Sequence, residues 1–346
     1  MKERPERVAD RELETSGMPL ERLDYDTAQL MAEHPPIWRD RNKQVVFGIN
    51  SPPGSIHGGQ LTYSRWAAMP VPDVVDPVAA RRLVEARDGF YDYAPSLGPG
   101  AVEWHVNFAD PHLFVAYSGG LFAQDEMQVA EHPALGAVKE ALASAGHRAV
   151  TIDAGEPTPA LVTGVERRCR IVTDRDASAG RPDGLYGNAF SRASTEAVTR
   201  ATTRIDPPTV TNIVAMSAPP GGYGRYRAET IEAVLVTAFT GFRAAVLESR
   251  RMVGPDVRVA VHTGYWGCGA FGGNRVLMAL LQVLAGGMAG LDSLVFHVGA
   301  PGGRAPLEEA LRRLRDELAV ASPVRARDLI EQITALGFAW GVSDGN

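Results

Sequence analysis

The sequence predicts an α/β sandwich. Short apolar runs, of the length of buried strands, alternate with longer stretches in which apolar residues recur at helical spacing. The 346 residues are 45% hydrophobic and 22% charged, which is ordinary for a globular protein that buries a sizeable core. The chain shows neither an internal repeat nor a low-complexity tract. We therefore expect one large α/β domain, or such a domain with an appendage.

The first half of the chain contains three strand candidates, at 44–50, 102–108 and 149–153, and two helix candidates. Residues 1–45 are polar and charged, and we expect an arm or short helices there. Strands are expected at 44–50, where a proline–glycine turn follows, and at 102–108. Helical spacing predicts helices at 76–87 and 134–145.

The second half alternates more regularly after an unclear stretch. Within residues 154–205 we expect a strand at 168–173 and a loop at 174–184. The elements expected after this stretch are, in chain order, strand 210–216, helix 228–250, strand 257–261, helix 275–289, strand 293–298, helix 306–318 and helix 325–336.

Charge and cysteine content exclude several classes of protein. A net charge of −6 argues against a broad basic surface for nucleic acid. We see no apolar run of membrane-spanning length and no signal peptide behind the charged N-terminus, so we expect no membrane partner and a cytoplasmic location. Cys169 and Cys268 are the only cysteines, and no cluster has the spacing of a zinc site. Lysine is nearly absent, which is typical of a GC-rich, bacterial genome.

A glycine-rich segment is the strongest local signal. Five glycines fall within residues 264–273, between an apolar run and a helical pattern. A strand, a glycine turn and a helix N-terminus together bring backbone N–H groups against a phosphate. A structural turn with aromatic residues in the core is the other interpretation. Tyr265, Trp266 and Phe271, which lie between the glycines, favour a nucleotide site.

This segment also resembles a known family. It is similar to the ATGNWGCGAFGGD block of the poly(ADP-ribose) glycohydrolases, which wraps the diphosphate of ADP-ribose. Four further blocks match in the right order: Val106–Ala109 resembles VNFA, Gln124–Glu126 resembles the catalytic QEE, Asn212–Ala218 resembles EIVAIDA, and Leu277–Gln282 resembles LKALIQ. The matches span roughly residues 100–300.

The resemblance implies a specific architecture. We expect a macrodomain-like three-layer sandwich, with a mixed central sheet and helices on both faces. Residues 99–346 would form the macrodomain-like glycohydrolase domain, and residues 1–98 an N-terminal extension that packs on it. The family's mechanism needs no metal and no cofactor.

The resemblance also assigns candidate site residues. By position, Glu126 is the general acid that protonates the leaving oxygen of a ribosyl bond, and Asp125 stands where the family contacts the ribose hydroxyls. Partial burial would suit Glu126 by raising its pKa toward neutrality. The candidate substrate-binding residues are Asp110, Gln124, Gly264, Tyr265, Gly267, Gly269, Ala270, Phe271 and Gly272.

Several family contacts are replaced in this chain. The family's triple glycine falls at Phe114-Val115-Ala116, where three side chains would obstruct a diphosphate. A loop re-routed through Gly119-Gly120 would compensate. The adenine-stacking Phe position is Val298, a loss of roughly 1–3 kcal/mol of stacking. Tyr186 or Tyr223 would supply a ring from another direction.

Three functions fit this pattern. The first is a glycoside hydrolase-like enzyme that acts on ADP-ribose or a related nucleotide through Glu126. The second is a module that binds an ADP-ribosyl group or nucleotide without turnover. The third is an enzyme on an NAD-derived small molecule of specialised metabolism. Gln124 and Glu126 favour an enzyme, whereas the missing triple glycine favours the second and third functions.

Overall fold

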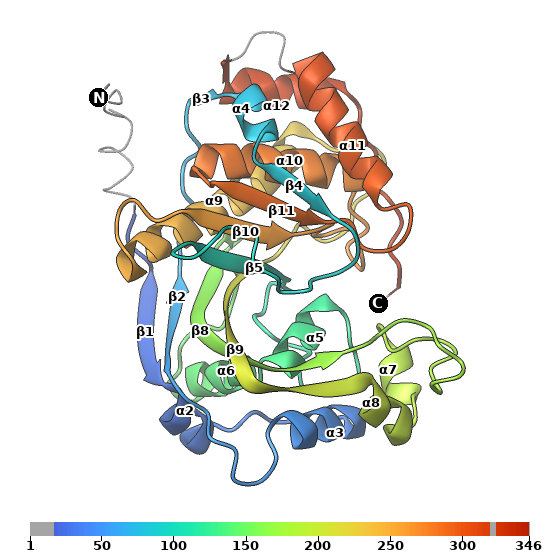
Figure 1. Cartoon of the computed structure of the whole chain (residues 1–346). Coiled ribbons are helices and arrows are strands. Elements are labelled where there is room, and N and C mark those ends of the chain that lie inside the picture. The colour runs from blue at the N-terminus through green and yellow to red at the C-terminus, as the bar shows by residue number, and fades with distance from the viewer. Residues whose placement is uncertain (1–16, 319–322, 346) are drawn as a thin grey trace.

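A single eight-stranded sheet organises the molecule (Figure 1). The computed structural model describes residues 17–318 and 323–345. The strands follow one another across the sheet in the order β1 (Glu21–Asp26), β2 (Gln60–Arg65), β8 (Ala160–Ile171), β9 (Thr202–Met216), β5 (Val102–Phe108), β10 (Val259–Thr263), β11 (Ser293–His297) and β4 (Val84–Arg87). The pairs from β1 to β9 are antiparallel and those from β9 to β4 are parallel, so the sheet is mixed.

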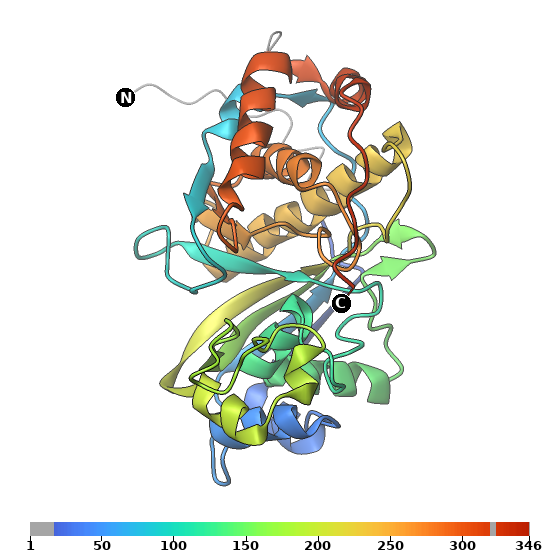
Figure 2. The ribbon, with the colours of Figure 1, turned by 90° about the vertical axis from the view of Figure 1, so that its right-hand side faces the viewer.

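Helices cover both faces of this sheet (Figures 1 and 2). One face carries α4 (Pro77–Arg81), α9 (Ala228–Met252), α10 (Arg275–Ala289), α11 (Arg304–Arg313), a π-helical turn (Leu314–Leu318) and α12 (Ala326–Ala335). The other face carries α2 (Thr27–Glu33), α3 (Arg41–Asn50), α5 (Gln124–Glu131), α6 (Ala134–Ser144), α7 (Ala189–Arg192) and α8 (Thr195–Ala201). Two small ribbons complete the fold, β3 (Val74–Val75) with β12 (Val324–Arg325), and β6 (Ile152–Asp153) with β7 (Glu156–Pro157). The predicted three-layer sandwich is confirmed.

The larger core lies between the sheet and helices α9 and α10. Alternate residues of β5 and β10, among them Trp104 and Val261, point into it, as the period of two in a strand requires. Trp266, from the glycine-rich segment, is buried here too, and its Nε1 donates to Met216 O at 2.9 Å. Asn274 ends that segment by capping α10: its side chain accepts from Val276 N and Leu277 N. The glycine-rich segment is thus held at both ends.

The expected N-terminal extension is part of the sheet. Strands β1 and β2 extend it at one edge through β8, and β4 completes the other edge beside β11. A strand gains its backbone hydrogen bonds only by pairing, so these segments are integral to the sandwich and do not form an appendage on a finished domain. Residues 17–98 and 99–345 therefore share one sheet, and residue 98 marks no break in it. Residues 1–16, included in the predicted extension, lie outside the described residues.

Two predictions of secondary structure were wrong. The expected strand at 44–50 is helix α3, because the Asp40 side chain accepts from Asn42 N and Lys43 N and so caps a helix through the β-branched run. The helix expected at 76–87 ends at Arg81, and the remainder becomes the edge strand β4. In the first case a local cap decided the structure, and in the second case β4 gained its partner, β11, from far away in the sequence.

Helix α9 has the length and apolar composition of a membrane span, contrary to our sequence analysis. However, 72% of its apolar window is buried inside the protein, against α10 and the sheet. A core helix of a soluble protein passes the same test, so this finding is weak evidence for a membrane segment.

Candidate active site

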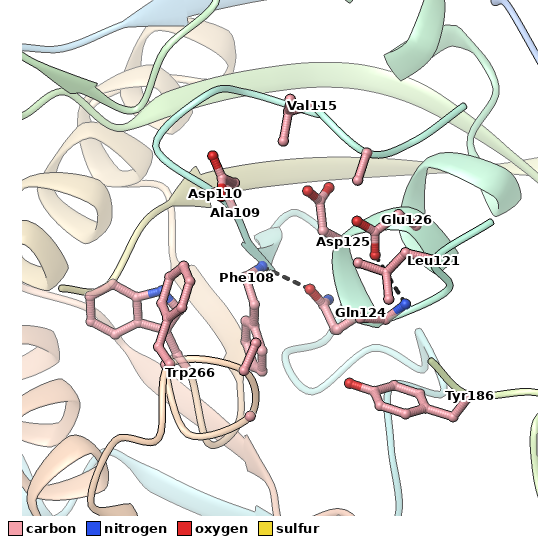
Figure 3. Close-up of a pocket in the computed structure, with 16 residues that line it drawn as sticks. Phe108, Ala109, Asp110, Val115, Leu121, Gln124, Asp125, Glu126, Tyr186 and Trp266 are labelled. Atoms are coloured by element: carbon pink, nitrogen blue, oxygen red, sulfur yellow. Dashed lines mark hydrogen bonds between the residues drawn. The ribbon is translucent and has the colours of Figure 1, made fainter. Parts of the chain in front are cut away.

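A cavity of about 220 Å³ opens beside the C-terminal end of β5 (Figure 3). Three segments form it: the stretch from β5 to the start of α5, the loop that carries Tyr186, and the glycine loop, a name that we use for residues 264–273. The lining residues are Phe108, Ala109, Asp110, Val115, Ala116, Leu121, Ala123, Gln124, Asp125, Glu126, Tyr186, Trp266, Gly267, Gly269, Ala270 and Phe271. The structure therefore brings the Gln124–Glu126 block and the glycine loop to one site.

Gln124 fixes the start of α5 to the end of β5. Its Oε1 accepts from Phe108 N at 2.7 Å, and its Nε2 donates to Val106 O at 3.1 Å. The side-chain amide thus makes the hydrogen bonds that a neighbouring strand would make to the end of β5, and it holds the start of α5 at a set distance from β5. Gln124 lines the cavity, but both ends of its amide bind backbone, so its role is to position the two carboxylates that follow.

Asp125 and Glu126 lie side by side in the cavity, below the loop of Val115 in the view of Figure 3. Asp125 Oδ1 accepts from Asn107 Nδ2 at 3.0 Å, and Glu126 Oε2 accepts from Ala123 N at 3.0 Å. Both side chains are buried, and burial raises the pKa of both. The negative charge of Glu126 raises the pKa of Asp125 further. At neutral pH such a pair retains a proton, which a general acid requires.

Lys43 is a buried cation behind the carboxylates, and sequence reasoning missed it. Its Nζ donates to Tyr117 O at 2.7 Å and to Ala116 O at 3.4 Å, which ties helix α3 to the wall of the cavity. Burial lowers the pKa of Lys43 to about 8, while Glu126, Asp40 and Asp125 act in the opposite direction. The positive charge in turn lowers the pKa of Glu126 and of Asp125. No local motif marks this residue, because the contact spans more than 70 positions.

The glycine loop depends on glycine for its path. Gly267 has φ +74°, and a Cβ there would lie 2.5 Å from the Cβ of Ala218. Gly273 N donates to Gly267 O at 2.8 Å and Gly272 N to Gly269 O at 3.0 Å, so the loop closes on itself. The N–H groups of Gly269, Ala270 and Phe271 make no backbone hydrogen bond within the described residues. They are the donors that this loop can offer to a ligand.

The segment that replaces the triple glycine is only partly obstructive. Phe114 has φ +52°, a left-handed backbone that favours glycine, and its ring is fully buried in the second core, away from the cavity. Val115 is 50% exposed and lines the cavity together with Ala116. Two side chains, those of Val115 and Ala116, therefore narrow the cavity, and not three. The expectation that Phe114 occupies this space was wrong, because its backbone turns the ring into the core.

Tyr186 supplies an aromatic wall from the loop before α7. Burial, followed by the charges of Asp344 and Glu126, raises the pKa of Tyr186 to about 12, so its hydroxyl stays protonated. Sequence analysis offered Tyr186 and Tyr223 as alternatives. Tyr223 is fully exposed and is not among the lining residues.

Three candidate binding residues lie outside the cavity lining. The hydroxyl of Tyr265 donates to Gly303 O, and its ring packs edge-on against Phe296. Gly264 O accepts from Gln282 Nε2 at 3.0 Å, beneath the cavity. Gly272 faces the C-terminal residues instead, since a Cβ there would lie 3.0 Å from Ser343 N. These side chains and backbones support the loop from behind. Asp110, by contrast, lines the cavity.

The described residues contain no group of three or more histidine, cysteine, aspartate or glutamate side chains placed to hold a metal ion. Cys268 lies in the glycine loop, and burial raises its pKa to about 12, so it stays a thiol at neutral pH.

Fold and cavity together define an α/β protein of the macrodomain class, with two buried carboxylates facing a glycine loop. A family model described as poly(ADP-ribose) glycohydrolase (PARG), macro domain fold, matches residues 184–300. Over these residues the chain is thus similar to the poly(ADP-ribose) glycohydrolases, the resemblance that its sequence indicated. The matched segment contains Tyr186 and the glycine loop but ends short of Asp125 and Glu126, which the fold brings to it.

The chain is also similar to solved structures of these enzymes. A mutant of the Thermomonospora curvata glycohydrolase is 19% identical, with 70% of this chain and 84% of that chain covered and a TM-score of 0.41. The same enzyme bound to the inhibitor ADP-HPD is 17% identical, with 88% and 89% covered and a TM-score of 0.39. The Deinococcus radiodurans glycohydrolase in complex with ADP-ribose is 17% identical, with 70% and 90% covered and a TM-score of 0.38.

Proposed function

We propose that the protein hydrolyses a ribosyl glycosidic bond in ADP-ribose or a related nucleotide, with Glu126 as general acid. One observation carries the proposal: two buried carboxylates, one retaining a proton, share a cavity with a glycine loop of the glycohydrolase type. Both cysteines are free, which supports a reducing, cytoplasmic location.

The geometry supports different roles for the two carboxyl groups. Glu126 is held through one oxygen by Ala123 N, so its carboxyl group has a set direction within the cavity. It would protonate the leaving oxygen as the ribosyl C–O bond breaks, and the resulting carboxylate would accept a proton from the water that attacks the sugar. Asp125, held by Asn107, would bind a ribose hydroxyl and set the position of the sugar. No metal takes part in these steps.

The test is hydrolysis by the full chain and its Glu126→Gln variant, with ADP-ribose release from poly(ADP-ribose) and from an O-ADP-ribosylated peptide followed by chromatography. We expect Glu126→Gln to lower turnover by roughly 10²- to 10⁴-fold, with ligand affinity kept within about tenfold, since the shape remains and the proton donor is lost. Glu33→Gln, an exposed position on α2, is the matched control.

Two outcomes would contradict the proposal. Full activity of Glu126→Gln would show that the acid lies elsewhere. Binding of nucleotide without any hydrolysis by the wild type would favour the alternative of a non-hydrolytic binding module. That alternative has an observation in its favour, since Glu126 uses one oxygen to cap its own helix.

A further inference from the structure

Strands β5 and β10 stop pairing at the level of the cavity. Their parallel register ends at the pair His105 and His262, while β5 stays paired with β9 as far as Phe108 and β10 stays paired with β11 as far as Thr263. We call the space between the two strands beyond this pair the strand gap. The end of β5 holds the start of α5, with its two carboxylates, and the end of β10 leads into the glycine loop. The width of the strand gap therefore sets how far the carboxylates lie from the glycine loop.

The side-chain amide of Gln124 occupies the β5 side of the strand gap. It accepts from Phe108 N, along the dashed line of Figure 3, and donates to Val106 O. Ala109 N donates to Met216 O of β9, so the preceding N–H group, that of Phe108, faces the opposite edge of β5, where β10 would pair. Gln124 thus takes the place of β10 on this edge of β5.

Tyr91, from the segment between β4 and β5, joins the two sides of the strand gap. Its hydroxyl lies 3.0 Å from Val106 O and 3.2 Å from His262 O. Carbonyl oxygens only accept, so the hydroxyl shares its proton between them, and burial raises the pKa of Tyr91 well above its usual value, which keeps that proton in place. Val106 O accepts from Gln124 as well as from Tyr91. One carbonyl oxygen therefore connects α5 and β5 and, through Tyr91, β10.

The ring of Tyr91 is held from both sides of the strand gap. It packs edge-on against His105 of β5 and His297 of β11, with centroids 5.4 Å and 5.0 Å apart. It also lies edge-on to Phe108, a residue that lines the cavity, at 6.5 Å. His297 Nδ1 lies 3.2 Å from the backbone oxygen of Phe90, next to Tyr91 in the chain. These contacts fix the place of the ring, so the hydroxyl can act as a spacer between the strands.

We propose that Tyr91 is a positioning residue for the reaction, whose hydroxyl holds β5 and β10 at the separation at which Glu126 meets a ribosyl bond bound against the glycine loop. This inference rests on the proposed function. Loss of the hydroxyl would remove a shared donor from two buried carbonyl oxygens, and α5 would then move relative to the glycine loop. A displacement of about 1 Å between reacting groups is enough to lower a rate roughly 10²-fold.

The test compares the full-length wild type with Tyr91→Phe, which keeps the ring and removes the hydroxyl. Ser249→Ala is the matched control, because the buried Ser249 hydroxyl accepts from Trp104 Nε1 at 2.8 Å and so also binds β5, but from α9 and not across the strand gap. Both variants should lower the melting temperature by a few degrees. Only Tyr91→Phe should lower kcat for ADP-ribose release from poly(ADP-ribose) and from the O-ADP-ribosylated peptide, by roughly 10- to 100-fold, with KM changed by less than about threefold.

Hydrogen–deuterium exchange gives a readout that does not depend on hydrolysis. The Phe108 amide is held by Gln124 Oε1, so its exchange should become about fivefold faster or more in Tyr91→Phe, relative to amides of β8, and stay unchanged in Ser249→Ala. A variant with para-aminophenylalanine in place of Tyr91 restores N–H donors at the place of the hydroxyl. It should return both kcat and the exchange rate to within about threefold of the wild type.

Three results would overturn the inference: wild-type kcat in Tyr91→Phe, an equal loss of kcat in Ser249→Ala, and failure of the para-aminophenylalanine variant to recover either kcat or exchange. Absence of hydrolysis in the wild type contradicts the proposed function instead. In that case the exchange of the Phe108 amide still decides whether Tyr91 holds the strand gap, so the two proposals fail separately.

Discussion

The wall made by Phe114, Val115 and Ala116 allows a test in which stability and binding should separate. Each residue is changed singly to glycine. The Phe114 ring is fully buried, and loss of such a ring costs roughly 3–5 kcal/mol. Relief of the left-handed backbone at φ +52° returns about 1 kcal/mol, while the greater freedom of glycine in the unfolded chain costs about 0.5–1 kcal/mol. We therefore expect Phe114→Gly to lower the free energy of unfolding by about 2.5–5 kcal/mol.

Val115 is half exposed, so loss of its side chain costs about 1 kcal/mol from burial. Each change to glycine also raises the conformational entropy of the unfolded chain, which lowers the free energy of unfolding by about 0.5–1 kcal/mol. For Ala116 this is the main cost. The effects of the three variants on ADP-ribose binding should rank in the opposite order to their effects on stability. Val115 and Ala116 line the cavity, so their removal should tighten ADP-ribose binding by a few-fold, whereas Phe114→Gly should not.

Urea unfolding followed by fluorescence measures the first quantity, and isothermal titration with ADP-ribose the second. The reasoning would be refuted if Phe114→Gly tightened ADP-ribose binding while costing less than about 1 kcal/mol, because its ring would then stand in the cavity.

Two further predictions concern charge in the buried site. Asp125 has a raised pKa in the folded state, so its stabilising contribution is full below pH 4 and is lost as pH rises through the folded pKa. Asp125→Asn should therefore gain in stability relative to the wild type from pH 4 to 8, by up to about 1.4 kcal/mol per pH unit, and an unchanged difference in unfolding free energy would count against this. Lys43→Met removes the cation that lowers the pKa of Glu126, so the alkaline limb of kcat/KM, where the acid deprotonates, should move to higher pH. An unmoved limb would show that Lys43 does not act on the acid.

Local signals were sufficient to predict much of the scaffold. Helix α10 spans residues 275–289 as its periodicity indicated, because Asn274 caps it and its apolar residues repeat at helical spacing. Strand β5 and the glycine loop were equally clear, since each is specified by neighbours a few residues away. Their family resemblance then indicated that Asp125 and Glu126 lie opposite the loop, and the cavity brings them together.

The tertiary structure decided how this site is closed. The direction of the Phe114 ring depends on a left-handed backbone that sequence patterns do not encode for an aromatic residue. Lys43 and Asp344 reach the site from segments far away in the chain, through contacts with backbone atoms that any residue would offer. Sequence by itself determined α10, β5 and the glycine loop, because these depend on local spacing, and the family resemblance identified the two carboxylates. Size and charge at the cavity rim depend on packing between distant segments, and only the fold brings those segments together.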